Sequence, residues 1–177
     1  MAAWTPNLSW IVADLAVGGS FPMGRARELA ERHGVGGVID LRAEACDDRS
    51  VLDACGLAFL HLPTDDHAAL EQDALALGVE FGREMRRGGR RLLIHCEHGI
   101  GRSATLALCV LTDRGFSPLR ALAKAKDARA LVSPSPAQYH AWVAWLERWR
   151  TLHPADWDIP TFDAFKAIAY RHLSPQA

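Results

Sequence analysis

The chain has 177 residues, of which 49% are hydrophobic, and its formal net charge of −1 corresponds to a pI of about 6.7. This length predicts one domain with enough apolar residues for a substantial core. The near-neutral charge predicts no binding to nucleic acids or membrane surfaces, and the lack of an 18-residue apolar run argues against a membrane span.

The first half of the chain alternates strand and helix signals. Residues 9–12 and 15–17 predict a strand pair, and Pro22 opens a helix that Gly34 stops. A buried strand over 35–41, a short helix over 49–55 and a strand over 57–62 follow. A longer amphipathic helix is predicted over 68–87, because its apolar positions recur at steps of three and four: Leu70, Ala74, Leu77, Phe81 and Met85.

The second half predicts a strand over 90–95, a loop, and a nearly all-apolar helix to about Arg114. Two Ser-Pro pairs open further helices over 117–129 and 135–150. Three tryptophans on the second of these share one face, which predicts a core stripe rather than an aromatic ligand site: Trp142, Trp145 and Trp149. A last helix is predicted over 161–173. We therefore expect an α/β layered fold, with a largely parallel central sheet flanked by helices.

The nine residues 95–103 read His-Cys-Glu-His-Gly-Ile-Gly-Arg-Ser and carry the clearest functional signal. Cys96 and Arg102 stand at the two ends of a glycine-containing loop between an apolar strand and a helix N-terminus. Free N–H groups and the helix dipole at such a start bind phosphate-sized anions. The same field stabilises a thiolate, and a guanidinium can hold two phosphoryl oxygens. The segment thus predicts an anion cradle, a nucleophile and a charge clamp in one loop.

This segment resembles the His-Cys-x-x-Gly-x-x-Arg-Ser signature of the cysteine-dependent protein tyrosine phosphatase superfamily, in particular its small dual-specificity branch. Five fixed positions match: His95, Cys96, Gly99, Arg102 and Ser103. Looser similarity extends over about residues 8–150, where residues 38–42 resemble a strand before substrate-facing loops and residues 62–66 the segment with the general acid. The resemblance implies a phosphatase domain over 1–153, with 154–177 as a helical extension that packs on or trails it.

The resemblance also implies a phosphomonoester hydrolase with a phosphocysteine intermediate, most simply a protein tyrosine or dual-specificity phosphatase. Cys96 is then the nucleophile, Arg102 binds the phosphoryl group, and Ser103 eases loss of the thiolate, unless it is an ordinary first-turn helix serine. His95 would order the loop by hydrogen bonding. The backbone amides that bind phosphate would belong to Glu97, His98, Gly99, Ile100, Gly101 and Arg102.

The general acid is expected about thirty residues before the nucleophile in small members of the family, where both Asp65 and Asp66 lie. We favour Asp66, because related phosphatases usually use the second member of an Asp-Asp pair. Either aspartate could instead cap the helix predicted to follow. His67 is a weaker candidate, since its neutral imidazole is a poorer proton donor. Gln138 is a further candidate, for positioning the hydrolytic water.

The remaining cysteines, Cys46, Cys55 and Cys109, lack such surroundings and are expected to be inert. Their irregular spacing predicts neither a disulfide framework nor a metal site, and no cofactor is expected. With no secretory signal in the sequence, we expect a reduced, cytoplasmic protein. The scarcity of lysine beside abundant arginine indicates a GC-rich, bacterial genome. The sequence does not predict the oligomeric state.

The predicted partner is a phosphorylated protein or a small phosphomonoester. Phosphoinositide-directed relatives tend to carry loop lysines, whereas Glu97, His98 and Ile100 stand here, and no tyrosine-bearing segment deepens the pocket. We expect a shallow pocket for phosphotyrosine that can also admit phosphoserine or phosphothreonine. Two other classes of protein stay open, a phosphate-binding pseudophosphatase and a thiol enzyme of the rhodanese or arsenate reductase type. Against the second class, the cysteine loop of rhodaneses is usually shorter, and small arsenate reductases carry this loop near the N-terminus.

Overall fold

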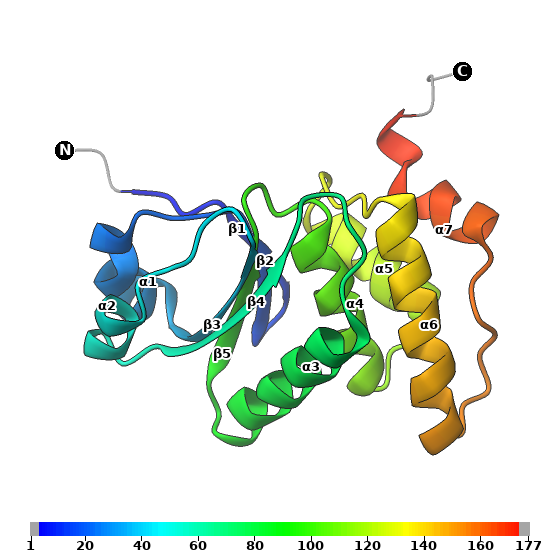
Figure 1. Ribbon diagram of the computed structural model, residues 1–177, viewed down its shortest axis with the longest axis horizontal. Helices are drawn as coiled ribbons and strands as arrows, with labels where there is room; N and C mark the ends of the chain where they lie inside the picture. Colours follow the sequence, from blue (N-terminus) through cyan, green and yellow to red (C-terminus); the bar gives the residue numbers. More distant parts are fainter. Residues whose placement is uncertain (1–3, 174–177) are drawn as a thin grey trace.

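The computed structural model describes residues 4–173, and within them five strands form one mixed sheet in the order β1-β2-β5-β3-β4 (Figure 1). The pair β1 (Leu8–Val12) and β2 (Leu15–Gly18) is antiparallel. All other neighbours are parallel, namely β5 (Arg91–His95), β3 (Val35–Arg42) and β4 (Ala58–Thr64). The predicted α/β fold with a largely parallel sheet is confirmed, and the motif-bearing strand β5 occupies the middle of the sheet.

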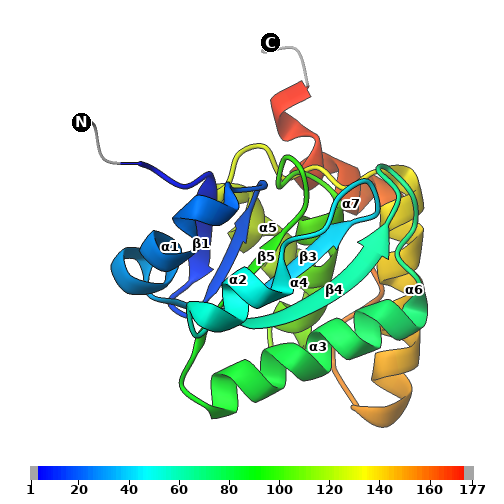
Figure 2. The same ribbon diagram turned by 60° about the vertical axis from the view of Figure 1, so that its left-hand side comes forward.

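Helices cover both faces of the sheet (Figures 1 and 2). A 3-10 turn (Met23–Arg25), α1 (Ala26–His33) and α2 (Arg49–Ala54) lie on one face. The other face carries α3 (Gln72–Arg87), α4 (Arg102–Asp113), α5 (Pro118–Ala128) and α6 (Pro136–Leu152). Finally, α7 (Phe162–Ala169) packs on α5 and leads into a 3-10 turn, Arg171–Leu173.

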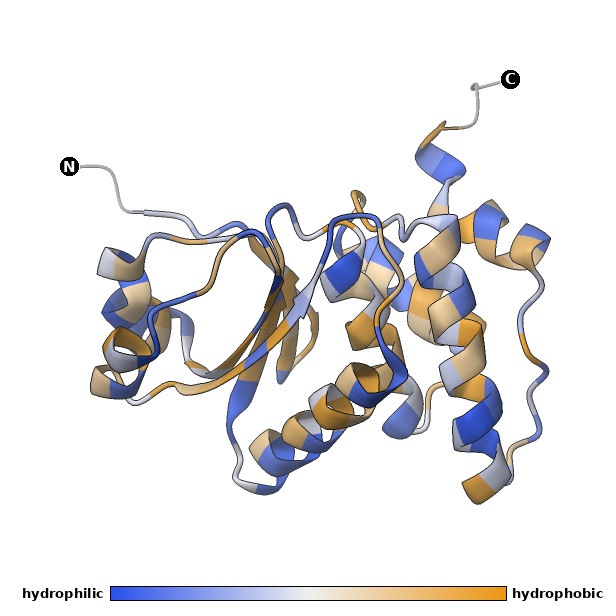
Figure 3. Cartoon of the chain, in the orientation of Figure 1, coloured by the Kyte–Doolittle hydropathy of each residue, from blue (hydrophilic) through white to orange (hydrophobic). Residues whose placement is uncertain are grey.

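The two faces bury two apolar cores, because successive strand side chains point to opposite sides. On β5, Leu92 and Ile94 enter the larger core under α3–α6, whereas Leu93 enters the smaller core under α1 and α2. The concentration of hydrophobic residues along the strands and α4 is visible in Figure 3. As predicted, Trp142 and Trp145 on α6 belong to the larger core, and the partly buried Trp149 packs against it.

The helix predicted over 68–87 begins four residues later, at Gln72. Residues 65–71 instead form a loop in which His67 has a left-handed backbone, with φ of 60°. Leu70 is buried from this loop, while Leu77, predicted on the apolar face, is 58% exposed. The contact with α4 shifts that face: Leu106 of α4 packs directly against Gly78, where an added Cβ would collide with it.

The predicted last helix, 161–173, is split into α7 and the following 3-10 turn. Residues 1–3 and 174–177, which the predicted divisions 1–153 and 154–177 include, lie outside the described residues. Across the part of the chain that is described, no helix combines the length and hydropathy needed to cross a membrane.

Candidate active site

The loop at residues 97–101 lies at the carboxyl end of the central strand β5 and leads directly into α4. Cys96 follows the last strand residue, and Arg102 is the first residue of the helix. Residues 102–112 of α4 are all buried, so the helix that carries the predicted guanidinium and hydroxyl is fixed within the core. The motif therefore has the strand–loop–helix setting that its sequence predicts.

Every carbonyl of this loop is hydrogen-bonded to a group outside it. The acceptors and donors are Glu97 O with Ser20 N, His98 O with Arg129 Nη2, Gly99 O with Arg129 Nε, Ile100 O with Ser133 N, and Gly101 O with Thr105 N, at 2.7–3.0 Å. In a trans peptide the C=O and the following N–H point in opposite directions. Holding the carbonyls outward therefore turns the amides of residues 98–102 inward, as an anion cradle requires.

Gly99 is required by this geometry. Its φ is +69°, a conformation that costs other residues energy. An added Cβ would also lie 2.5 Å from the carbonyl carbon of Gly18. The β2 end and the loop thus touch backbone to backbone.

Cys96 is buried at the floor of the cradle, with 3% of the residue exposed. The Gly99 amide donates to Sγ at 3.3 Å, and the Ser103 hydroxyl lies 3.4 Å from it. Burial raises the pKa of the thiol, but the hydrogen bonds from the Ser103 hydroxyl and from the amides of Ser103, Gly99 and Ile100 outweigh it and leave the pKa lowered. By contrast, burial raises the pKa of Cys109 well above its ordinary value.

The Arg102 guanidinium is almost fully buried and held by Glu44, a residue that sequence reasoning missed. Nη1 and Nη2 donate to the two carboxylate oxygens of Glu44 at 2.7 and 2.8 Å, and Nη1 also donates to Thr64 O at 2.8 Å. This pairing lowers the pKa of Glu44 to about 2. Among the described residues, the buried Nε of Arg102 has no hydrogen-bond partner. A donor is therefore left free for an anion in the cradle.

The two candidate acids separate in space. Asp66 lies beside the site, with Oδ1 3.4 Å from Arg102 Nη2, whereas Asp65 lines a different hollow together with Ala43 and Pro63. Neither caps α3, whose N-cap is Glu71, so the predicted capping role is wrong. His67 also lines the site, but its side chain is 84% exposed.

A cavity of about 80 Å³ opens above the sulfur. Its lining brings together several of the predicted residues, namely Asp66, His67, Cys96, His98, Ile100, Gly101 and Gln138, and adds Ser133, which the sequence did not predict. The Oε1 of Gln138 accepts from Ser135 N in a capping box at the start of α6. Two larger hollows, of about 260 and 350 Å³, lie elsewhere, between α3 and α6 and beside the start of α5, and do not include the loop.

A buried ion network supports the loop from behind. His95 Nε2 lies 2.7 Å from Asp47 Oδ2, and its Nδ1 lies 3.2 Å from Cys96 O. Arg42 pairs with Asp47 at 2.7 Å and with both oxygens of Asp40. It also reaches Glu97 at 3.4 Å. His95 therefore contacts the loop, and Asp47, which sequence reasoning missed, orients it.

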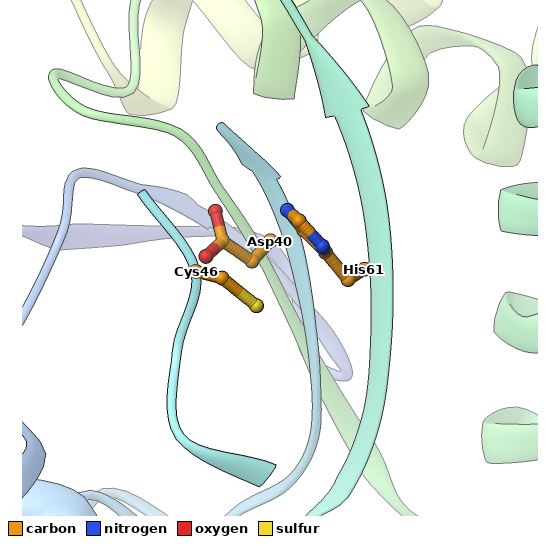
Figure 4. A group of neighbouring side chains, drawn as sticks. All are labelled: Asp40, Cys46 and His61. Carbon is orange, nitrogen blue, oxygen red and sulfur yellow. The ribbon is translucent and has the colours of Figure 1, made fainter. Parts of the chain in front are cut away.

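Two groups of potential metal ligands occur in the same region, Asp40 with Asp47 and His95, and Asp40 with Cys46 and His61 (Figure 4). Both carboxylate oxygens of Asp40 already accept from Arg42, and His61 Nε2 lies 2.8 Å from Arg42 O. An arginine at the centre would repel a cation. These donors fit an arginine-centred ion network better than a metal site.

Comparison with known proteins agrees with this geometry. Residues 21–115 match the family model described as "Polymorphic toxin system, DSP-PTPase phosphatase". The structure is similar to that of Tk-PTP in its active form (TM-score 0.74, 25% identity, covering 81% of this chain and 98% of that one). It also resembles PTPMT1 in complex with PI(5)P (0.77, 22%, 82% and 98%) and human DUSP28 (0.72, 23%, 82% and 99%). No curated protein matches the sequence.

Proposed function

The chain belongs to the DSP-PTPase phosphatase family of polymorphic toxin systems, within the cysteine-dependent protein tyrosine phosphatase superfamily, and we propose that it hydrolyses phosphomonoesters through a phosphocysteine on Cys96. The observation that carries this proposal is the loop 97–101, whose carbonyls are all bonded on its outside while Gly99 N donates to the sulfur. A site built in this way favours both a thiolate and a bound oxyanion.

Substrate binding would use the inward amides and Arg102. A phosphoryl group in the 80 Å³ cavity would accept from the loop N–H groups and from the free Nε of Arg102. Glu44 holds the outer edge of the same guanidinium and so fixes its plane. Pre-organised donors of this kind act most strongly when charge spreads over the equatorial oxygens in the transition state.

In the first step, the Cys96 thiolate would attack phosphorus, the S–P bond would form, and the bond to the leaving oxygen would break. Asp66 would donate its proton to that oxygen. In the second step, water would attack the phosphocysteine, the S–P bond would break, and the Asp66 carboxylate would accept the water's proton. The Ser103 hydroxyl, 3.4 Å from the sulfur, would stabilise the returning thiolate. Gln138, which lines the cavity, would orient the water.

A phosphorylated tyrosine side chain is the substrate that this cavity suits best, with phosphoserine or phosphothreonine as further possibilities. No lysine lines the cavity, and the carboxylate of Glu97, the first residue of the phosphate-binding loop, is half-exposed. Both features disfavour a head group with several phosphates. A small, singly phosphorylated metabolite is the alternative, since such a molecule needs no more room than an aryl phosphate.

Hydrolysis of an aryl phosphate by wild type, Cys96→Ser, Asp66→Asn and the matched control Asp65→Asn tests the proposal. We expect activity to vanish with Cys96→Ser, to fall about 100-fold with Asp66→Asn, and to persist with Asp65→Asn. Phosphate binding without turnover by wild type would indicate a pseudophosphatase. Turnover of thiosulfate or arsenate in place of the phosphate ester would indicate a different thiol enzyme. A panel of phosphopeptides, inositol phosphates and nucleotides then distinguishes the substrate classes.

A further inference from the structure

The loop between α5 and α6, residues 129–135, forms part of the wall of the active site and contacts two other loops of the site. Ser133 lines the cavity, and its amide donates to Ile100 O in the phosphate-binding loop at 2.9 Å. The Ser135 hydroxyl donates to His67 O, next to Asp66, at 2.8 Å. The α5–α6 loop therefore joins the phosphate-binding loop to the loop that carries the acid.

The bond from Ser135 acts on a strained residue. His67 has a φ of 60°, which costs a non-glycine residue about 1–3 kcal/mol. Such a conformation persists only where the surroundings hold it. The position of Asp66 thus depends on where the α5–α6 loop places Ser135.

The C-terminal segment also contacts this loop, through its carbonyl groups. The Tyr170 hydroxyl, just after α7, donates to Pro134 O at 2.6 Å. Lys126 on α5 donates to Val132 O at 2.8 Å, and its Nζ also lies 2.7 Å from His172 Nδ1. The hydrogen bonds to the Val132 and Pro134 carbonyls therefore both involve residues that follow α7, His172 through Lys126 and Tyr170 directly.

Burying the amino group of Lys126 at this position costs stability. Its side chain is 1% exposed, yet its partners are a carbonyl and an imidazole, and among the described residues no carboxylate pairs with it. Burial and the nearby Arg171 lower the pKa of Lys126 to about 8. A methionine of similar length would fill the same space without a buried charge. Stability alone does not account for a lysine here.

We propose that Tyr170 and Lys126 are positioning residues, through which the C-terminal segment 162–173 fixes the α5–α6 loop and thereby the reach of Asp66. The inference rests on the proposed function, in which Asp66 protonates the leaving group. It assigns a role to a segment that lies beyond the residues matched by the family model. Its path is short: Tyr170 to Pro134, Ser135 to His67, and His67 to its neighbour Asp66.

The measurement is how strongly kcat/KM depends on the leaving group of the phosphate ester. A poor leaving group such as phenol needs the acid, whereas p-nitrophenol needs it far less. We expect Tyr170→Phe to lower kcat/KM for phenyl phosphate about fivefold more than for p-nitrophenyl phosphate, which is the factor that one hydrogen bond is worth. Tyr139→Phe is the matched control, because Tyr139 also donates to a carbonyl, that of Pro160 just before α7, at 2.7 Å, but not to the α5–α6 loop.

Lys126→Met gives a second, independent measurement. We expect a Tm equal to or above that of wild type, combined with the same selective loss on phenyl phosphate. Equal losses on both substrates, or a loss that follows Tm across all three variants, would show a merely structural role and overturn the inference. If Asp66→Asn itself shows no dependence on the leaving group, the proposed acid fails; if Asp66→Asn shows it and the Tyr170 and Lys126 variants do not, only the inference fails.

Discussion

Replacing Arg129 tests whether the hydrogen bonds to the outward-facing carbonyls of the phosphate-binding loop orient the inward amides that lower the pKa of Cys96. Arg129 lies at the end of α5, is almost fully buried, and donates to Gly99 O at 2.7 Å and to His98 O at 2.8 Å. Its Nη2 also donates to Asn7 Oδ1 at 2.8 Å, which fixes the guanidinium from behind. Arg129→Met keeps the apolar stem and removes these three bonds, together with a longer one from Nη1 to Ser9 Oγ at 3.5 Å. The peptide units whose amides belong to Gly99 and Ile100 are then free to rotate.

Two effects of measurable size should follow. Leaving two carbonyls without a charged donor should lower the free energy of unfolding by about 2–4 kcal/mol. Misdirecting the amides should lower kcat/KM about 100-fold, because one lost oxyanion donor costs roughly 10²–10³-fold. The loop keeps its bonds to Ser20, Ser133 and Thr105, so we expect the lower end of that range. The pKa of Cys96 should rise, since the Gly99 and Ile100 amides help to lower it.

The pH dependence of Cys96 alkylation by iodoacetamide measures this pKa directly, in a Cys46→Ser background that removes the exposed thiol. Arg120→Met is the matched control, since Arg120 lies on the exposed face of the same helix and contacts the Phe116 ring. If Arg129→Met alkylates with the wild-type midpoint and keeps the kcat/KM of the control variant, the outer bonds do not set the inner field, and the reasoning is refuted.

Three further predictions concern the catalytic groups. The kcat/KM of wild type should rise with pH as the Cys96 thiol ionises, with a midpoint below the ordinary value of about 8.5; a midpoint at or above that value would contradict the lowered pKa. Measured at a pH where the Cys96 thiol is ionised, Ser103→Ala should slow the second step more than the first, so that rapid-quench kinetics show a burst of alcohol followed by a slow phase; a steady rate without a burst would exclude this role. The pKa of Glu44 is lowered to about 2 in the folded state, so its carboxylate stabilises the protein above its ordinary pKa near 4.3 and loses this effect as the pH falls toward 2. Over that window the free energy of unfolding of Glu44→Gln should fall by about 1 kcal/mol less than that of wild type, a small difference because solvent screens the half-exposed carboxylate. Denaturant titrations in which both proteins lose the same free energy of unfolding would argue against the pairing.

The sequence was sufficient to predict the central motif, because its chemistry is encoded in consecutive residues. An apolar strand, a glycine-containing loop and an apolar helix place Cys96 and Arg102 at one anion-binding helix start, whatever the rest of the fold does. The parallel sheet followed from the alternation of strands and helices in the same way. The Gly34 stop of α1 was also readable, since its φ of 68° is the conformation that glycine adopts most easily.

The partners of the motif could not be predicted, because they come from distant parts of the chain and bind backbone atoms. Arg129 and Ser133 donate to loop carbonyls about thirty residues earlier in the sequence. Because every residue has a backbone carbonyl, the sequence does not indicate which carbonyl will be an acceptor. Glu44 offered one usable signal: it follows β3, whose carboxyl end lies beside that of β5 in the parallel sheet. Asp40 and Arg42, in contrast, were visible only as part of a strand.

The late start of α3 shows that apolar spacing does not fix where a helix begins. The spacing predicts a helix from residue 68, but residues 68–71 stay in the loop that follows His67, whose backbone is left-handed and whose carbonyl accepts from Ser135. Leu70 still enters the core from the loop, so the periodic pattern survives while the helix does not.

The local field, rather than the overall charge, makes this site suitable for a dianion. The chain carries a net charge of −1, and three carboxylates surround the loop: Glu44, Asp66 and Glu97. Each lies within 3.4 Å of an arginine nitrogen. Hydrogen bonds from the hydroxyl and amides around Cys96, acting over about 3 Å, lower its pKa against the effect of burial. Because such short-range terms are screened little by salt, the orientation of a few peptide units decides whether the pocket can hold both a thiolate and a phosphoryl group.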